Sequence, residues 1–213
     1  MGTAGYNTVV KRTGTTTNFT GESMSATSVT NQYQIDDASK EVWDRSVSLT
    51  FYEDASPIPD SDIERINYVF GKVTFTTAKT GAITVDGAYF PTQALSGASS
   101  YSIDQSVNLE DRTDFENAKT NNSFRTYQPT LFDVSVSVTR FDDLSNLYHA
   151  EWDAGDPLVV EIQPGGGTND VFRSYVLIES ANKSGDIEAL EEEDISFQLD
   201  NTQDGLAWGW RDY

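Results

Sequence analysis

The feature that most constrains this fold is a set of runs in which apolar and polar residues alternate with a period of two. Residues 101–109 form one such run, and residues 130–141 form a longer one. Successive side chains of a strand point to opposite faces, so this alternation predicts strands with one buried face and one wet face. A third run, at 158–162, is mostly apolar and predicts a more deeply buried strand. The stretch 101–164 is therefore expected to supply the main sheet.

The N-terminal part of the chain predicts a second β region. Shorter alternating runs lie at 47–51, 72–76 and 83–90. The turn residues at 79–81 join the last two of these runs into a predicted hairpin, and 63–68 is expected to be a brief helix or turn. We therefore assign residues 31–92 to one β segment, inserted in or packed on the core. Residues 1–30 are rich in Thr, Ser and Gly and predict an N-terminal arm that is flexible or rests on a partner.

The rest of the chain is expected to form the principal domain. Residues 93–205 predict an all-β fold, a β-sandwich or partly closed barrel, with one short flanking α-helix at 143–154. The last residues, 206–213, form an aromatic C-terminal tail that holds Trp208 and Trp210. Two exposed indoles are unfavourable in water, so this tail is expected to dock on its own subunit or on a neighbour.

Charge and composition exclude several classes of protein. The net charge is −20, and residues 107–213 carry 22 acids against 7 bases. Wrapping of nucleic acid needs a basic surface, whereas an acidic surface would let nucleic acid slide past without adhering. Solubility, or adaptation to a salty medium, explains the same charge equally well. The chain has no cysteine, which excludes disulfides and thiolate metal sites, and no apolar run long enough to span a bilayer.

The sequence offers no set of catalytic or metal-binding residues. His149 is the single histidine, and no Gly-x-Ser-x-Gly elbow accompanies it. The acidic cluster from Asp60 to Glu64 lacks the glycine and the distal glutamate of a calcium-binding EF-hand loop. Three glycines at 165–167 precede no Gly-Lys-Ser/Thr and are expected to connect two strands. We therefore predict no catalytic residue, no cofactor and no metal, and an enzyme is the weakest class.

Three motifs follow one another in an order typical of a known family. They are Tyr101-Ser-Ile-Asp-Gln-Ser-Val, then Phe124-Arg-Thr-Tyr-Gln-Pro-Thr-Leu-Phe-Asp-Val-Ser-Val, then Asp156-Pro-Leu-Val-Val-Glu-Ile-Gln-Pro-Gly-Gly. With the helical pattern around Leu147 between the last two, this order resembles the major tail tube proteins of long-tailed, siphovirus-like bacteriophages over about residues 90–205. The sequence departs from the family at Thr130, where a glycine is expected. A second departure is segment 31–78, which a minimal tube subunit does not need.

The resemblance implies a structural virion protein that assembles into stacked, commonly hexameric rings. Its implied partners are further copies of itself, the tail terminator, the tape measure and the distal tail proteins, and no membrane. Genomic DNA would pass through the lumen without specific binding, and the protein would lie in the virion tail after assembly in the host cytoplasm. The residues predicted to lie at subunit or ring contacts are Asp111, Arg112, Phe115, Phe124, Arg125, Tyr127, Trp208 and Trp210.

Two alternatives stay open from the sequence. One is a carbohydrate-binding or other β-sandwich adhesion module, with Trp43, Trp152, Trp208 and Trp210 as candidate platforms for sugars. The other is a tail or head-completion protein that forms a single ring without stacking.

Overall fold

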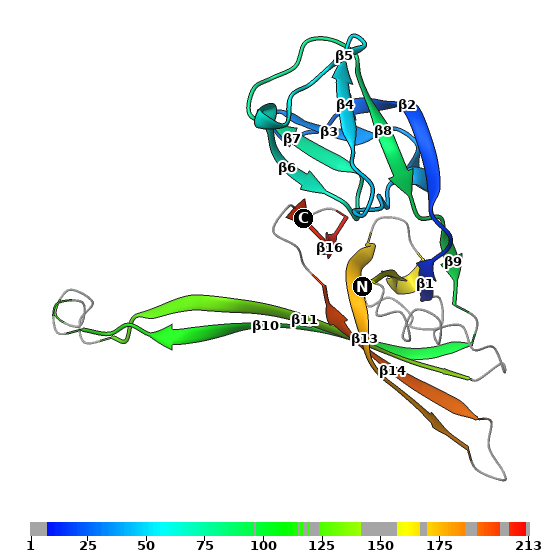
Figure 1. Cartoon of the computed structure of the whole chain (residues 1–213). Helices are drawn as coiled ribbons and strands as arrows, with labels where there is room; N and C mark the ends of the chain where they lie inside the picture. Colours follow the sequence, from blue (N-terminus) through cyan, green and yellow to red (C-terminus); the bar gives the residue numbers. More distant parts are fainter. Residues whose placement is uncertain are drawn as a thin grey trace.

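The chain forms two β-sheets joined at a common junction. The computed structural model describes residues 8–95, 97–114, 116, 119, 124–141, 157–166, 170–185, 191–200 and 205–211. Strands make up most of these residues, so the predicted all-β fold is confirmed. Sheet A and sheet B have eight strands each and lie at the bottom and the top of Figure 1.

Sheet A has the strand order β10-β11-β14-β13-β12-β1-β9, and β16 also pairs with β13. Every pair among these strands is antiparallel. The strands are β1 (Val9–Thr13), β9 (Thr92–Ala94), β10 (Ala98–Asp111), β11 (Tyr127–Phe141), β12 (Leu158–Gln163), β13 (Phe172–Ser184), β14 (Glu192–Leu199) and β16 (Trp208–Trp210). The short 3-10 segment η4 (Pro164–Gly166) follows β12, so the glycines lead from β12 toward β13, its antiparallel neighbour.

Sheet B has the order β15-β6-β7-β3-β2-β8-β4-β5. The strands are β2 (Thr17–Ala26), β3 (Gln32–Ile35), β4 (Thr50–Glu53), β5 (Ser56–Pro57), β6 (Ile63–Asn67), β7 (Lys72–Phe75), β8 (Ile83–Tyr89) and β15 (Gly205–Leu206). Two 3-10 segments, η2 (Ala38–Lys40) and η3 (Asp60–Asp62), lie in its connections. This sheet draws on residues 17–89 and on one C-terminal strand. The hairpin expected from 72–76 and 83–90 is not formed, because β3 and β2 lie between β7 and β8.

Both sheets curl around their own cores. In sheet A, Val10 of β1 and Val136 of β11 belong to one buried cluster, although β12, β13 and β14 lie between their strands. In sheet B, the rings of Phe51 on β4 and Phe75 on β7 meet edge to face at 5.9 Å across the inside of the curl. A sheet brings such distant strands together only by bending, so each lobe is a partly closed barrel.

The N-terminal residues differ from the expected arm, because they form strands in both sheets. β1 pairs with β12 and β9 of sheet A, and β2 pairs with β3 and β8 of sheet B. Phe19 and Met24 are the buried residues of β2, and its Thr, Ser and Glu side chains mostly face water. Short β-branched and hydroxyl side chains suit the wet face of a strand, which explains why this composition resembles a loop. The division of the chain at 31–92 and 93–205 stays a prediction.

Two further expectations meet different outcomes. Residues 63–68, expected as a brief helix or turn, contain strand β6, whose partners are β7 and β15. This expectation was wrong because Ile63 and Ile66 pack against the sheet B core from a strand that a bulge interrupts. The predicted helix at 143–154 lies outside the described residues.

The C-terminal residues 205–211, here called the strap, fasten the two sheets together. β15 pairs in parallel with β6 of sheet B, and β16 pairs with β13 of sheet A. Between them, Ala207 is buried, and its carbonyl accepts a hydrogen bond of 2.7 Å from the Tyr175 amide. The tail that carries the two tryptophans therefore docks on its own subunit.

A buried ion network closes the junction between the sheets. Arg173 of β13 donates to Glu161 of β12 at 2.6 Å and to Glu41 of the sheet B lobe at 2.7 Å. Lys11 of β1 pairs with Glu161 at 2.7 Å, and Arg211 of the strap pairs with Glu41 at 2.7 Å. Both carboxylates thus have two cationic partners, which offsets the cost of burying their charge.

An apolar cluster surrounds this network. A turn after β6 presents Phe70 to the junction. In this turn the Asn67 side-chain oxygen accepts hydrogen bonds of 3.2 Å from the amides of Val69 and Phe70, and Gly71 adopts a φ of 57°. Val69 and Phe70 pack with Val159 and Tyr175 of sheet A, and all four are at most 1% exposed. The two lobes therefore share a buried apolar contact.

Candidate functional site

The most distinctive surface is a hairpin that leaves the body of sheet A. Strands β10 and β11 pair from Ala98 and Arg140 as far as Asp111 and Tyr127. Residues 104–111 and 127–133, here called the hairpin extension, lead away from the body of sheet A, and the outer part of the hairpin projects clear of both lobes in Figure 1. Eight residues of strand span about 26 Å, and every residue of the extension is exposed. A two-stranded ribbon is marginally stable in water, so this element is suited to packing against a partner.

One face of the extension continues the buried face of sheet A. Residues directly opposite each other on antiparallel strands share a face, and Ile103 pairs with Val136 near the root of the hairpin. Further out, the same face carries the pair Val107 and Phe132, which are 40% and 69% exposed. The apolar row that forms the core therefore runs on into solvent. Beyond it, a register shift between Val107 and Leu109 turns the ribbon.

The opposite face of the same strands carries short polar and acidic side chains. Its cross-strand pairs on β10 and β11 are Ser100 with Thr139, Ser102 with Ser137, Asp104 with Ser135 and Ser106 with Asp133. Ser196 and Asp194 extend this face onto β14, opposite Ser137 and Thr139. None of these residues is Lys or Arg, and three are Asp, so the face carries short hydroxyl side chains and a negative charge.

The tip of the hairpin, residues 111–127, gathers five of the predicted interface residues. Phe124, Arg125 and Tyr127 are 74%, 72% and 50% exposed. The Asp111 carboxylate accepts from the Thr113 hydroxyl at 2.5 Å and from its amide at 2.9 Å, and Arg125 lies 3.7 Å away. These hydrogen bonds, and then the Arg125 charge, hold the pKa of Asp111 below its usual range. Arg112 completes the set by donating to Gln128.

The two predicted tryptophans lie elsewhere, and Phe115 lies outside the described residues. Trp208 and Trp210 are half-buried on β16, opposite Ser174 and Phe172 of β13. The rings of Trp210 and Phe172 meet edge to face at 5.3 Å. The structure therefore separates the predicted residues into two places, the tip of the hairpin and the strap.

A shallow apolar groove lies beside the strap. Its volume is about 710 Å³, and its described lining residues are Gln105, Asp170, Leu206, Trp208, Gly209 and Trp210. Gln105 is opposite Val134 on β11, two positions from Val107 on the same face. The groove and the apolar face of the extension are thus neighbouring parts of one surface.

Sequence reasoning missed the apolar residues along the extension, above all Leu109, Leu131 and Phe132. It assigned them to strands with one buried face and one wet face, but all three are exposed, at 57%, 67% and 69%. One signal was available in the sequence: adjacent Leu131 and Phe132 break the period of two. The observed strands, of 14 and 15 residues, exceed the usual length of a strand. The strands also extend beyond the 101–109 and 130–141 runs.

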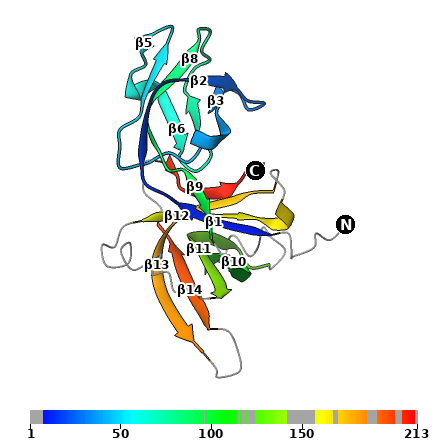
Figure 2. The same cartoon turned by 90° about the vertical axis from the view of Figure 1, so that its right-hand side faces the viewer.

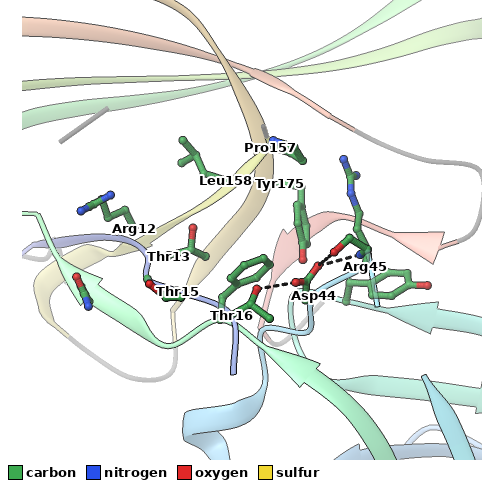
Figure 3. Close-up of a pocket in the computed structure, with 14 residues that line it drawn as sticks. Arg12, Thr13, Thr15, Thr16, Asp44, Arg45, Pro157, Leu158 and Tyr175 are labelled. Atoms are coloured by element: carbon green, nitrogen blue, oxygen red, sulfur yellow. Dashed lines mark hydrogen bonds between the residues drawn. The ribbon is translucent and has the colours of Figure 1, made fainter. Parts of the chain in front are cut away.

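A second hollow lies at the junction of the lobes, with a volume of about 670 Å³ (Figure 3). Thr16 donates to Asp44 at 2.6 Å, and Asp44 also accepts from the Ser46 amide and hydroxyl. The Arg45 guanidinium stacks over the Tyr175 ring at 4.6 Å and pairs with Asp200. Burial raises the pKa of Tyr175, whose hydroxyl donates to the Trp43 carbonyl. These groups satisfy one another and hold the lobes together, so the hollow is part of the junction.

Within the described ranges, no three His, Cys, Asp or Glu side chains are placed to hold a metal ion. No helix in the described part of the chain is long and apolar enough to cross a membrane. Trp43 is fully buried, so it cannot present its ring to a sugar.

Comparisons with known proteins give similarities of structure. No protein-family model and no curated protein matches this chain. The chain is similar to a protein in the tail of an empty gene transfer agent particle with C6 symmetry, at 11% identity and a TM-score of 0.46, over 56% of this chain and 86% of that chain. It is similar, at the same identity and TM-score, to a protein in the virion of a native gene transfer agent particle, over 56% of this chain and 88% of that chain.

Proposed function

We propose that this protein is a structural subunit of a bacteriophage-type virion tail, which assembles with copies of itself into stacked six-fold rings that form a tube. The observation that carries the proposal is the hairpin extension, whose apolar face continues the core of sheet A into solvent. Val107 and Phe132 lie on that face and are exposed in the single chain. Exposed apolar surface of this kind marks a contact with another molecule. The resemblance of residues 90–205 to tail tube proteins is the reason for proposing that these contacts form stacked rings.

Rings and tubes need contacts that close on themselves and contacts that repeat along an axis. The extension is a one-sided element, with an apolar face and a polar face on the same two strands. A surface that packs on a different surface of the next copy makes a heterologous contact, which generates rings or stacks instead of closed dimers. A projecting hairpin is well suited to this role, because its own lobe cannot cover it.

The polar face of sheet A is the part suited to line the tube. It carries Asp104, Asp133 and Asp194 among serine and threonine side chains. Carboxylates repel phosphate, and short hydroxyls on rigid strands give a passing duplex little to hold. In the proposed tube this face would let genomic DNA pass without binding. The partners would be other copies of this chain, with the tail terminator, tape measure and distal tail proteins at the ends.

The test is electron microscopy of the purified full chain at high concentration, with two matched double variants. The wild type is expected to form rings and tubes. Val107→Ser with Phe132→Ser, on the apolar face, is expected to leave a folded monomer, with an unchanged far-ultraviolet circular dichroism spectrum. Ser106→Thr with Asp133→Asn changes the neighbouring cross-strand pair on the polar face and is expected to assemble like the wild type. A wild type that stays monomeric at every concentration would refute the proposal.

A further inference from the structure

We propose that the tip of the hairpin from one copy seats in the groove beside the strap of a neighbouring copy, with Phe124 and Tyr127 against Trp208 and Trp210. This inference rests on the proposed self-assembly and names the two surfaces that meet. Both expose aromatic side chains, both belong to this chain, and neither is covered within the described residues.

The geometry excludes the same contact within one copy. Gln105 lines the groove and lies at the root of the extension, whereas Asp111 and Tyr127 pair at its outer end. Six residues of strand separate Gln105 from Asp111, a distance of about 20 Å along a continuous hydrogen-bonded ribbon. A paired ribbon cannot fold back on itself over that length without losing its ladder of hydrogen bonds. The tip therefore meets this groove in another molecule.

The groove has the size and chemistry to receive aromatic side chains. Its volume of about 710 Å³ lies within the range of about 300–1,000 Å³ that is typical of sites for organic groups. Leu206, Trp208 and Trp210 give it an apolar wall, and the Trp210 ring is fixed by its contact with Phe172. Aromatic side chains bury about 150–250 Å² each and favour edge-to-face packing, so two indoles are a suitable wall for Phe124 and Tyr127.

Charge also favours a second copy as the occupant. Residues 111–127 carry three acids and three bases, so the net charge of −20 lies entirely in the other residues of the chain. Two copies of such an acidic protein repel each other unless the contact region is locally neutral or cationic. The exposed Arg125 is at the tip, and the exposed Asp170 lines the groove, which gives a complementary pair at the rim.

The position of the groove links assembly to complete folding of the subunit. One side comes from β10, and the other comes from β16, the last strand of the chain. β16 is held by β13, and the strap is anchored further by Arg211 on Glu41. A chain whose C-terminal residues have not docked therefore lacks the groove and has no seat for its neighbour.

The chain contains no cysteine, which permits a direct cross-linking test. Gln105→Cys places a thiol in the groove, and Gln128→Cys places one beside the tip. The two single variants are mixed, assembled and treated with a short bismaleimide. Ser106→Cys, the next residue on the opposite face, replaces Gln105→Cys in the control. Assembly holds neighbouring thiols at an effective concentration near the millimolar range, so we expect covalent dimer from the Gln105 pair at least about tenfold above the control.

Each outcome decides the question. Dimer from the groove pair in assembled samples, and none after dilution to monomers, supports the contact. Rings or tubes that give equal or no cross-linking from both pairs overturn this inference and leave the proposed function standing. A mixture that shows no assembly by microscopy and no cross-linked dimer overturns both.

Discussion

The junction between the lobes and the hairpin extension are built from the same kinds of residue but end in opposite states. At the junction, Val159 and Phe70 are at most 1% exposed, and Arg173 satisfies two carboxylates. On the extension, Phe132 is 69% exposed, and at the tip of the hairpin the exposed Arg125 lies 3.7 Å from the Asp111 carboxylate. At the junction, both sides of the interface belong to one chain and cover each other. The extension supplies only one side of an interface, and we propose that another copy supplies the other side.

The difference lies in which sequence segments meet. The junction draws on residues far apart in sequence, Glu41, Glu161, Arg173 and Arg211, and the strap closes it by pairing with both sheets. The pairing of β11 with β14 ends at Ser135 and Gln198. Further out, within the described residues, β10 and β11 pair only with each other. A ribbon of two strands has no third element to cover its apolar face. Stability is therefore concentrated at the junction, and the capacity for assembly is concentrated at the extension.

The largest expected effect comes from emptying the ion network. Arg173→Met would leave Glu41 and Glu161 buried with fewer cations, and removing one partner of a buried pair costs about 3–5 kcal/mol. We expect the free energy of unfolding, measured in urea on dilute monomer, to fall by that amount. The matched control is Arg125→Met on the extension, where the side chain is 72% exposed. Its cost is expected to stay below about 0.5 kcal/mol, and equal losses from both variants would erase the contrast between the two regions.

A smaller effect separates two positions on one face of one strand. Val136→Ala shortens a buried side chain of the sheet A core by two carbon atoms. It is expected to lower the free energy of unfolding by about 2 kcal/mol, through the lost apolar burial and the cavity that is left. Phe132→Ala removes far more side chain but is expected to cost the monomer less than about 0.5 kcal/mol, because that ring is already in water. Assembly, followed by light scattering, should show the reverse order. A large loss of monomer stability from Phe132→Ala would mean that the extension is covered within its own chain.

How much of this could be read from the sequence depends on the range of the interactions. The alternation in 130–141 predicts a strand with Val134, Val136 and Val138 inward, and all three are buried. The same alternation cannot tell how far along a strand the core extends, so the exposure of Leu109 and Phe132 was not predicted. Phe124 and Arg125 were predicted to lie at subunit contacts, and both are exposed at the tip of the hairpin; their role in a contact stays a prediction.

The network at the junction was beyond the sequence for a different reason. Glu41 and Arg173 are separated by 132 positions, and in a chain with 34 acids no pattern selects the two that Arg173 binds. The strap was partly foreseen, since two tryptophans near the chain end predict docking, but its pairing with both sheets follows from tertiary topology. The N-terminal strands β1 and β2 were not predicted, because their Thr- and Ser-rich composition is typical both of exposed strand faces and of loops.

The smallest effect is a pH dependence confined to the junction. Burial alone would raise the pKa of Glu161, but the Arg173 guanidinium and the Lys11 ammonium outweigh burial and hold the pKa below the ordinary value of 4.5. A carboxyl with a lowered pKa in the folded state stabilises the fold above its unfolded pKa, and that stability is lost as the pH falls through the folded value. We therefore compare the wild type with Glu161→Gln, which resembles the protonated carboxyl. The gap in free energy of unfolding should be constant from pH 7 to about 5 and should narrow below 4.5, by no more than about 1.4 kcal/mol per pH unit, because one carboxyl exchanges at most one proton.

The control is Asp111→Asn on the exposed tip of the hairpin. The pKa of Asp111 is also lowered, chiefly by hydrogen bonds from Thr113. Its surroundings are solvent, so the difference in free energy of unfolding between this variant and the wild type should stay small at every pH. For Glu161→Gln, a difference that widens as the pH falls would show that Glu161 is protonated in the folded chain, and the network would then be held by Glu41 alone.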